Sequence, residues 1–314
     1  MVAFRDFDHG NQHLKPLRAR GTAAEFAKDE ASVCVGSGCG QFRVLIPAMS
    51  RVRSGDADIF YQVLGIGPPV VLLHPFPANH ELWLPAARSL TSRYQVIVPD
   101  LRGHGESAVG EGPASMQKHA SDVARVMDDA EIGRAALAGV SIGGYILFEF
   151  WRRYRGRVAA LALFNTKAPA DNTDARSARL KTAEEVLQRG VAPFVETMLP
   201  RLIGETTRKG RPDLVDGARQ MMLKMSPEDV SLVQRGMADR PDSVATLKTI
   251  NVPTLIVTGT EDILTGVAEA QLIQQNISGS ELQVIPKAGH YAVWEKAEEA
   301  GKSLRQFLDG VHGA

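Results

Sequence analysis

The stretch Gly139-Val140-Ser141-Ile142-Gly143-Gly144 decides the fold of this chain. The apolar residues 135–138 precede it, and a second apolar run, residues 145–151, follows it. A buried strand, a G-x-S-x-G turn and a helix in this order are typical of a nucleophile elbow, in which a sharp turn raises a serine hydroxyl clear of a sheet. We therefore predict that Ser141 is a nucleophile, flanked by glycines because a Cβ there would crowd the turn. The alternative interpretation is a buried serine in a glycine-rich turn.

The composition is that of an ordinary globular protein. The 314 residues are 44% hydrophobic and 23% charged, which is enough for a sizeable core in one large α/β domain or two smaller ones. The formal net charge is +0 and Lys and Arg are scattered, so no nucleic-acid or membrane partner is expected. The two cysteines, Cys34 and Cys39, indicate neither a disulfide framework nor a thiol nucleophile. Without a spanning apolar run or a signal-peptide core, the sequence predicts a cytoplasmic protein.

Residues 1–48 differ from the rest of the chain. They show no sustained period of 2 or 3.6 and contain the loop-forming stretch Gly36–Gly40. We predict a disordered N-terminal extension. A second hypothesis is that Met49, just before the first strand pattern, is the natural start, and the mass of the natively expressed protein distinguishes the two.

From residue 51 onward, strand patterns alternate with helix patterns. Two antiparallel strands are expected around Val52 and over residues 59–64, joined by a polar glycine turn. Further strands are predicted at 70–73, 94–98, 134–138, 158–164, 253–258 and 282–285, with helices at 81–90, 116–127, 145–151, 267–275 and 297–308. This alternation predicts an α/β core, residues 49–166 and 250–314, with a mostly parallel central sheet and helices on both faces.

Residues 167–249 interrupt the alternation with helical patterns only. Leu180, Ala183 and Leu187 are predicted to share one helical face, and Pro193 suits the first turn of another helix. Residues 226–229 (Ser-Pro-Glu-Asp) are typical of a helix start, with serine as N-cap and proline at the first position. We predict that this segment is a helical cap over the carboxyl edge of the sheet.

The predicted strand ends also supply an acid and a base for Ser141. Ligands of parallel sheets gather at the carboxyl ends of the strands. Asp262 follows the strand at 253–258, and His290 follows the last strand, 28 positions later. The order Ser, Asp, His is that of hydrolytic triads built on such sheets, so we assign Ser141, Asp262 and His290 as catalytic residues.

Three other residues compete for these roles. His104 also follows a strand, but its place in an Arg-Gly-His-Gly loop favours a structural role. Glu261 is the neighbour of Asp262, and the offset from the strand end favours the aspartate. In proteins of this architecture the acid can also stand at the end of strand 158–164, where this chain has Asn165, which cannot be a carboxylate.

An oxyanion intermediate would need two N–H donors. One is predicted to be the backbone N–H of Ile142, directly after the nucleophile at a helix N-terminus. The other is expected in the loop after strand 70–73. Pro75 and Pro77 have no N–H, which leaves Phe76 as the donor.

Residues 49–314 resemble the α/β-hydrolase superfamily, and within it the 3-oxoadipate enol-lactonase-like esterases and lactonases. The resemblance rests on five motifs in order: His74-Pro-Phe-Pro77, Pro99-Asp-Leu-Arg-Gly-His-Gly105, Gly139-Val-Ser-Ile-Gly-Gly144, Val257-Thr-Gly-Thr-Glu-Asp262 and Ala288-Gly-His290. A weaker likeness lies at residues 237–243. One departure is His74-Pro75, where relatives usually have His-Gly.

The resemblance implies hydrolysis of a small-molecule ester or lactone through an acyl-enzyme on Ser141, with no cofactor and no metal. Rival activities with the same triad are cofactor-free haloperoxidase or perhydrolase chemistry and C–C bond hydrolysis. From a different class, the chain could be a non-catalytic ligand-binding member of this fold. The sequence predicts no particular oligomeric state and no particular substrate.

Several residues are candidates for lining a substrate pocket. Trp83 and Trp294 stand near motif loops. Methionines of the helical segment could form an adaptable apolar wall, although a core role is the usual one for methionine. They are Met198, Met221, Met222, Met225 and Met237. The candidate cations for an acidic substrate, among which the sequence does not choose, are Arg153, Arg176, Lys181 and Arg201.

Overall fold

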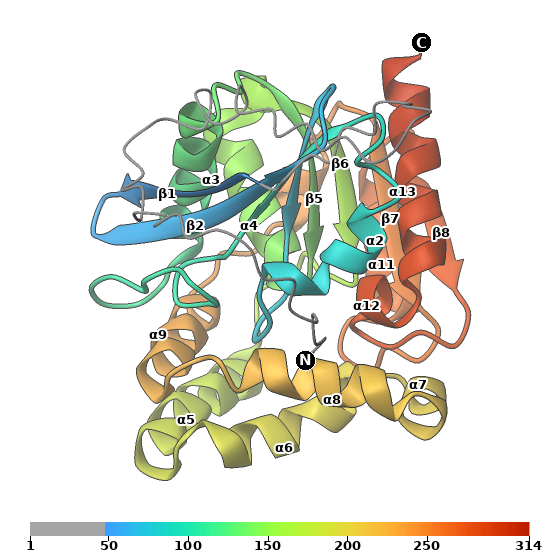
Figure 1. Ribbon diagram of the computed structural model, residues 1–314. Helices are drawn as coiled ribbons and strands as arrows, with labels where there is room; N and C mark the ends of the chain where they lie inside the picture. Colours follow the sequence, from blue (N-terminus) through green and yellow to red (C-terminus); the bar gives the residue numbers. More distant parts are fainter. Residues whose placement is uncertain (1–47, 314) are drawn as a thin grey trace, which may run out of the picture.

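An eight-stranded sheet forms the centre of the protein in the computed structural model, which describes residues 48–313 (Figure 1). Its strand order is β1-β2-β4-β3-β5-β6-β7-β8. The strands are β1 (Ala48–Ser54), β2 (Ala57–Leu64), β3 (Pro69–Leu73), β4 (Gln95–Pro99), β5 (Ala135–Val140), β6 (Val158–Phe164), β7 (Thr254–Gly259) and β8 (Glu281–Ile285). The predicted N-terminal extension lies outside the described residues, except that Ala48 already begins β1.

The sheet is antiparallel only at one edge. β1 pairs with β2, and β2 pairs with β4, in antiparallel register. The strands from β4 through β8 run parallel to their neighbours. The two central strands β3 and β5 pair from Val70 with Ala136 to Leu73 with Gly139, and their apolar residues are buried because helices cover both faces.

Helices cover both faces of this sheet, as the sequence predicts. α3 packs against α4, and α10 contacts both α4 and α11; on the other face α13 packs against α2 and α12 (Figure 1). The helices of these two layers are α2 (Leu84–Ala87), α3 (Met116–Asp129), α4 (Ile142–Tyr154), α10 (Val244–Leu247), α11 (Val267–Asn276), α12 (Ala292–Glu295) and α13 (Ala297–His312), with 3-10 turns η1 (His80–Leu82) and η2 (Arg155–Arg157).

A further layer of five helices lies between β6 and β7 in the chain. We call it the α5–α9 layer: α5 (Thr173–Arg189), α6 (Val191–Leu202), α7 (Glu205–Gly210), α8 (Pro212–Met222) and α9 (Pro227–Ala238). Figure 1 shows it gathered beyond one end of the sheet. The predicted start of α9 is confirmed, because Ser226 forms a capping box with Asp229 and Pro227 opens the helix.

Two local expectations are wrong. Ala183 and Val186 are the buried residues of α5, whereas Leu187 is 54% exposed, because α5 packs along α9 on the face that Val186 shares. The predicted helix at 81–90 is split into η1 and α2, since Pro85 lacks the N–H that a continuous helix would use.

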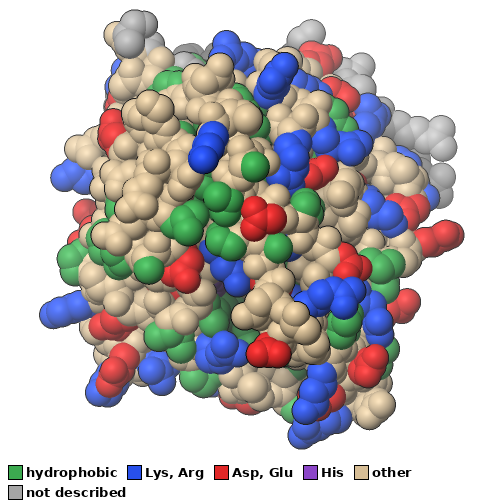
Figure 2. Space-filling view, turned by 180° about the vertical axis from the view of Figure 1, so that it is seen from behind, with side chains coloured by type: hydrophobic (Ala, Val, Ile, Leu, Met, Phe, Trp, Pro, Cys, Tyr) green, Lys and Arg blue, Asp and Glu red, His purple; other side chains and the backbone are tan. Residues whose placement is uncertain are grey.

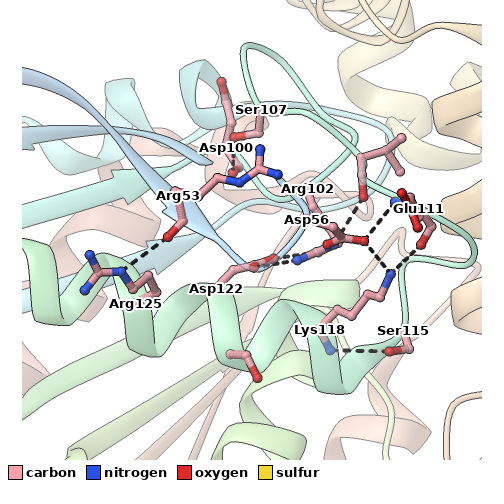
Figure 3. Close-up of polar contacts among 12 residues, drawn as sticks. Arg53, Asp56, Asp100, Arg102, Ser107, Glu111, Ser115, Lys118, Asp122 and Arg125 are labelled. Carbon is pink, nitrogen blue, oxygen red and sulfur yellow. Dashed lines mark hydrogen bonds and ion pairs between the residues drawn. The ribbon is translucent and has the colours of Figure 1, made fainter. Parts of the chain in front are cut away.

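The loop after β4 is held by a buried ionic network (Figure 3). Arg102 donates two hydrogen bonds of 2.7 Å to the carboxylate of Asp122 on α3 and a third, of 2.9 Å, to Asp56 in the β1–β2 turn. Lys118 adds a second cation at 3.0 Å from Asp56. A planar guanidinium that bridges two carboxylates fixes geometry as well as charge, so this loop is pinned to α3 and to the β1–β2 turn.

The face shown in Figure 2 has no large area of one charge. On the face turned away from the viewer in Figure 1, Lys and Arg side chains lie among Asp and Glu side chains, with small hydrophobic groups between them (Figure 2). Within residues 48–313, every helix is too short or too polar to cross a membrane.

Candidate active site

Ser141 occupies the sharp turn between β5 and α4. Its backbone has φ 54° and ψ −112°, a conformation that side-chain-bearing residues rarely adopt and that costs free energy. The flanking glycines are required by close packing. A Cβ on Gly139 would stand 2.5 Å from the carbonyl carbon of Gly143, and a Cβ on Gly143 would stand 2.7 Å from the Leu73 oxygen. The strand and the helix therefore meet at a distance that only glycine allows.

Asp262 and His290 meet at the carboxyl ends of β7 and β8. Oδ2 of Asp262 lies 2.9 Å from Nδ1 of His290, and the two residues are 7% and 2% exposed. The other oxygen, Oδ1, accepts hydrogen bonds from the backbone N–H groups of Leu264 and Thr265. Burial by itself would raise the pKa of Asp262. The neighbouring His290 and the hydrogen-bond donors outweigh burial and lower that pKa below its ordinary value, so the carboxylate stays ionised.

Asn165 also belongs to this site. From the sequence it was notable only because it occupies a position where a catalytic carboxylate could have stood. It directly follows β6 and has a positive φ of 44°. Its Nδ2 donates to Oδ2 of Asp262 at 2.9 Å and to the Gly289 oxygen at 3.2 Å. The amide thus links the predicted acid to the loop that carries His290. Its position at a strand end was visible in the sequence, but its partner was not.

The other two competing residues, Glu261 and His104, have different partners. The carboxylate of Glu261 accepts hydrogen bonds from the backbone N–H and the hydroxyl of Thr206, at the start of α7, so of the two neighbouring acids only Asp262 contacts His290. His104 is buried, with Nδ1 3.0 Å from the Arg102 oxygen and its ring edge against His74. It does not line the cavity described next, in keeping with a structural role.

A cavity of about 330 Å³ lies between the sheet and the α5–α9 layer. Its lining includes Ser141, His290 and Phe76. Ser141 and His290 face this shared space without a hydrogen bond between their side chains in the described structure. Contacts of this kind often become short only when substrate is bound.

Of the two predicted oxyanion donors, Phe76 lines the cavity, and Ile142 directly follows the cavity-lining Ser141. Phe76 lines the cavity and is held between Pro75 and Pro77, in a turn closed by a hydrogen bond of 3.0 Å from the Ala78 N–H to the Pro75 oxygen. Ile142 is the first residue of α4, where N–H groups lack partners within the helix. The N–H of Ile142 therefore lies at the positive end of the helix dipole, where a negative charge is stabilised.

Of the methionines and tryptophans that were candidates for the pocket wall, only two line the cavity. Met198 and Met237 line the cavity, whereas Met221, Met222 and Met225 belong to the core. The expectation for the tryptophans is wrong: Trp83 is fully buried and donates to the Leu73 oxygen, and Trp294 donates to the Leu214 oxygen over Gly217. Both indole N–H groups donate to backbone oxygens, and neither tryptophan lines the cavity.

Of the four candidate cations, only Arg201 lines the cavity. Arg153, Arg176 and Lys181 lie outside it and face the acidic side chains of Glu149, Asp239 and Glu185. The sequence missed Lys167 and Arg179, which do line it. Among residues 48–313, no group of three or more His, Cys, Asp or Glu side chains is arranged to hold a metal ion.

The sheet order, the strained serine turn and the Asp-His pair at the ends of β7 and β8 together define an α/β hydrolase. The family model for the alpha/beta hydrolase fold matches residues 68–297, and the chain belongs to that family.

Its relatives include esterases and lactonases. The chain is 27% identical over 244 residues to 3-oxoadipate enol-lactonase 1 of Acinetobacter baylyi, which covers 78% of this chain and 90% of that enzyme. Among solved structures, a thermophilic esterase from Thermogutta terrifontis with malate bound is 36% identical, with a TM-score of 0.82 over 84% of this chain and 99% of that one. The enol-lactonase from Burkholderia xenovorans shares the fold, with a TM-score of 0.77 at 24% identity over 82% of this chain and 99% of that one.

Proposed function

We propose that the protein is a serine hydrolase that cleaves a carboxylic ester or lactone through an acyl-enzyme on Ser141. The observation that carries this proposal is the buried Asp262–His290 pair, 2.9 Å apart, which shares one cavity with a serine on a strained turn. Relatives named as an enol-lactonase and an esterase support the ester or lactone bond as the target. We also propose that the α5–α9 layer acts as the cap that encloses the substrate.

The first half of the reaction transfers the acyl group to the enzyme. His290 Nε2 takes the Ser141 proton while the hydroxyl oxygen attacks the carbonyl carbon. Asp262 accepts from Nδ1 of His290, which fixes the ring tautomer and stabilises the imidazolium that forms. His290 then gives the proton to the leaving alkoxide, and the alcohol is released from an ester or stays tethered from a lactone.

The second half hydrolyses the acyl-enzyme. His290 takes a proton from water, the hydroxide oxygen attacks the acyl carbon, and the proton returns to Ser141 as the acid leaves. In both halves the N–H groups of Phe76 and Ile142 stabilise the tetrahedral oxyanion. Each such donor contributes about 100- to 1,000-fold to the rate in comparable sites.

The test is hydrolysis of p-nitrophenyl acetate and butyrate, beside a panel of lactones, by the wild type and by Ser141→Ala. We expect Ser141→Ala to lose activity on the order of 10⁴-fold or more while it remains folded, because the covalent route is removed. Ser177→Ala, an exposed serine on α5, is the matched control and keeps wild-type rates. The ester-to-lactone ratio then places the enzyme among its relatives.

Two results would contradict the proposal. One is a Ser141→Ala protein with undiminished activity, which would remove the serine mechanism. The other is a wild type that cleaves no ester and no lactone, which would favour a ligand-binding member of the fold.

A further inference from the structure

A buried carboxylate with three cations stands beside the cavity. Asp171 follows β6 and its side chain is 1% exposed. Oδ1 lies 3.1 Å from Nζ of Lys167 and 2.9 Å from Nη2 of Arg240, and Oδ2 lies 2.5 Å from Nε of Arg179. One negative charge therefore faces three positive charges.

The cations are not equivalent. Arg240 is 2% exposed, its guanidinium lies 4.2 Å above the Tyr145 ring, and it does not line the cavity. Lys167 and Arg179 are 24% and 22% exposed, and both line the cavity. Arg240 therefore contacts Asp171 on the side away from the cavity, whereas Lys167 and Arg179 face the space that a substrate would occupy.

The charged side chains that line the cavity leave an excess of positive charge. They are Lys167, Arg179 and Arg201 against the single carboxylate of Asp171, and the cavity lining also includes the titratable side chains of Tyr145 and His290. Burial favours the neutral form of Asp171, but the neighbouring arginines and Lys167 lower its pKa to about 2, so it counts as one full negative charge. Two positive charges remain without a counter-charge at the cavity wall. Positive charge that lines a cavity partly shielded from water attracts anions, which makes an anionic ligand the natural complement of this wall.

Free hydrogen-bond donors point to the same conclusion. A lysine ammonium carries three donors, and within residues 48–313 the Lys167 ammonium pairs only with Asp171. Arg179 uses Nε for Asp171 and Nη1 for Gln234 and the Met237 sulfur, so its Nη2 has no described partner. Both cations can therefore bind a second carboxylate without giving up Asp171.

The cation site lies close to the nucleophile along the sheet. β5 ends at Val140, which pairs with Phe164 at the end of β6. Ser141 comes next on one strand, and Asn165, Thr166 and Lys167 come next on the other. The Thr166 hydroxyl donates to the backbone carbonyl oxygen of Ser141 at 2.8 Å, which ties the two strand ends together. A short molecule can thus reach both Ser141 and Lys167.

We propose that Lys167 and Arg179, held in place by Asp171 and Arg240, bind a free carboxylate of the substrate, so that the enzyme acts on esters or lactones that carry a second, ionised acid group. This inference rests on the proposed function. Hydrolysis of such a monoester consumes one water and releases an alcohol and a dicarboxylate. Arg201, which also lines the cavity, adds to the attraction for the anion.

A matched pair of substrates tests the proposal. Monoethyl glutarate and ethyl pentanoate have the same length and differ by a carboxylate in place of a methyl group. We expect kcat/KM of the wild type to favour monoethyl glutarate by about tenfold or more, since a hydrogen-bonded ion pair in a shielded site is worth at least that factor. Lys167→Met and Arg179→Gln each lower this preference about tenfold, chiefly through KM. Arg176→Gln, one turn away on α5 and outside the cavity, leaves the preference unchanged.

A binding measurement separates this proposal from the serine mechanism. Calorimetric titration of wild type and of Lys167→Met with glutarate needs no turnover, and we expect Lys167→Met to bind about tenfold more weakly. Esters cleaved without preference for the anion would overturn the carboxylate site and leave the hydrolase assignment intact. Glutarate binding that depends on Lys167 in a protein that cleaves no ester would support the site and refute the hydrolase assignment. Equal glutarate affinity in wild type and Lys167→Met would overturn the site.

Discussion

Asn165 and Asp262 place an amide and a carboxylate in direct contact beside His290. The Asn165 amide donates to the same oxygen of Asp262 that contacts His290, and it is buried with it. A donor on a buried carboxylate favours its ionised form. At the scale of single residues, we therefore propose that Asn165 is a positioning residue, which keeps Asp262 ionised and fixes the direction of its carboxylate.

Asn165→Asp tests that role. The change puts two carboxylates within hydrogen-bond contact, and such a pair retains one proton to higher pH because both cannot ionise at this distance. We expect the acid limb of the kcat/KM profile for a neutral ester to move to higher pH by about one unit or more. Activity at pH 7 falls and partly recovers toward pH 9.

Asn165→Ala is the control for this prediction. It removes the same donor without adding a charge, so it lowers kcat/KM with little movement of the acid limb. Superimposable pH profiles for Asn165→Asp and the wild type would contradict the prediction, because they would show that a carboxylate at position 165 does not change the ionisation of Asp262.

At the scale of elements, Glu295 at the end of α12 joins the α5–α9 layer to the His290 loop. Its Oε2 accepts from the Gly204 N–H between α6 and α7 at 2.9 Å, and its Oε1 accepts from the Gly289 N–H at 3.0 Å. The N–H of Tyr291 donates to the Leu202 oxygen at 3.0 Å. A Cβ on Gly289 would stand 2.2 Å from the Gly204 nitrogen, so the two backbones touch. The layer is thus anchored to the loop that carries His290.

Glu295→Gln should loosen this junction. The carboxamide turns a donor toward one of the two N–H groups, so at least one charged hydrogen bond is lost, and we expect about 3 kcal/mol of lost stability. Because the loop that carries His290 loses an anchor, kcat falls more than KM rises. Thermal unfolding and ester kinetics measure the two effects.

The exposed Glu298 on α13 provides the comparison, since Glu298→Gln changes the same chemical group without touching the junction. An unchanged melting temperature and unchanged kcat in Glu295→Gln would remove Glu295 from any positioning role.

At the scale of the whole molecule, burial keeps three histidine side chains in the neutral form. Burial lowers the pKa of His74 to about 3, and it also lowers the pKa of His104 and of His119. His74 still has partners, because it accepts from the Leu101 N–H at 2.9 Å. Within the described structure, neither ring nitrogen of His119 has a hydrogen-bond partner.

These histidines predict acid sensitivity. An unfolded chain protonates histidine near pH 6.5, whereas the folded protein keeps His74 neutral down to about pH 3. The contribution of these neutral histidines to the free energy of unfolding is therefore fully present above pH 6.5 and is lost as the pH falls below that value. His74 alone accounts for about 2 kcal/mol between pH 7 and pH 5. Urea unfolding midpoints at the two pH values measure the loss.

His119→Leu provides the decisive comparison. It removes a buried polar ring that lacks partners, so we expect higher stability at pH 7 and a smaller decline toward pH 5. The opposite result would be a His119→Leu protein that is less stable than wild type and has the same pH dependence. It would show that the buried neutral His119 ring does not reduce the free energy of unfolding.

Local patterns of the sequence determined the order of strands and helices, the serine turn, and the acid and histidine at successive strand ends. Apolar runs, glycine spacing and helix caps act over a few residues, so they can be recognised without the fold. The buried face of α5, the inward packing of Trp83 and Trp294, and the cations Lys167 and Arg179 were decided only by tertiary structure. The partner of Asn165, 97 positions away at Asp262, was decided in the same way. The reason is physical: which side of a helix is buried, and which distant charges meet, depends on how whole elements pack, and no short stretch of sequence carries that information.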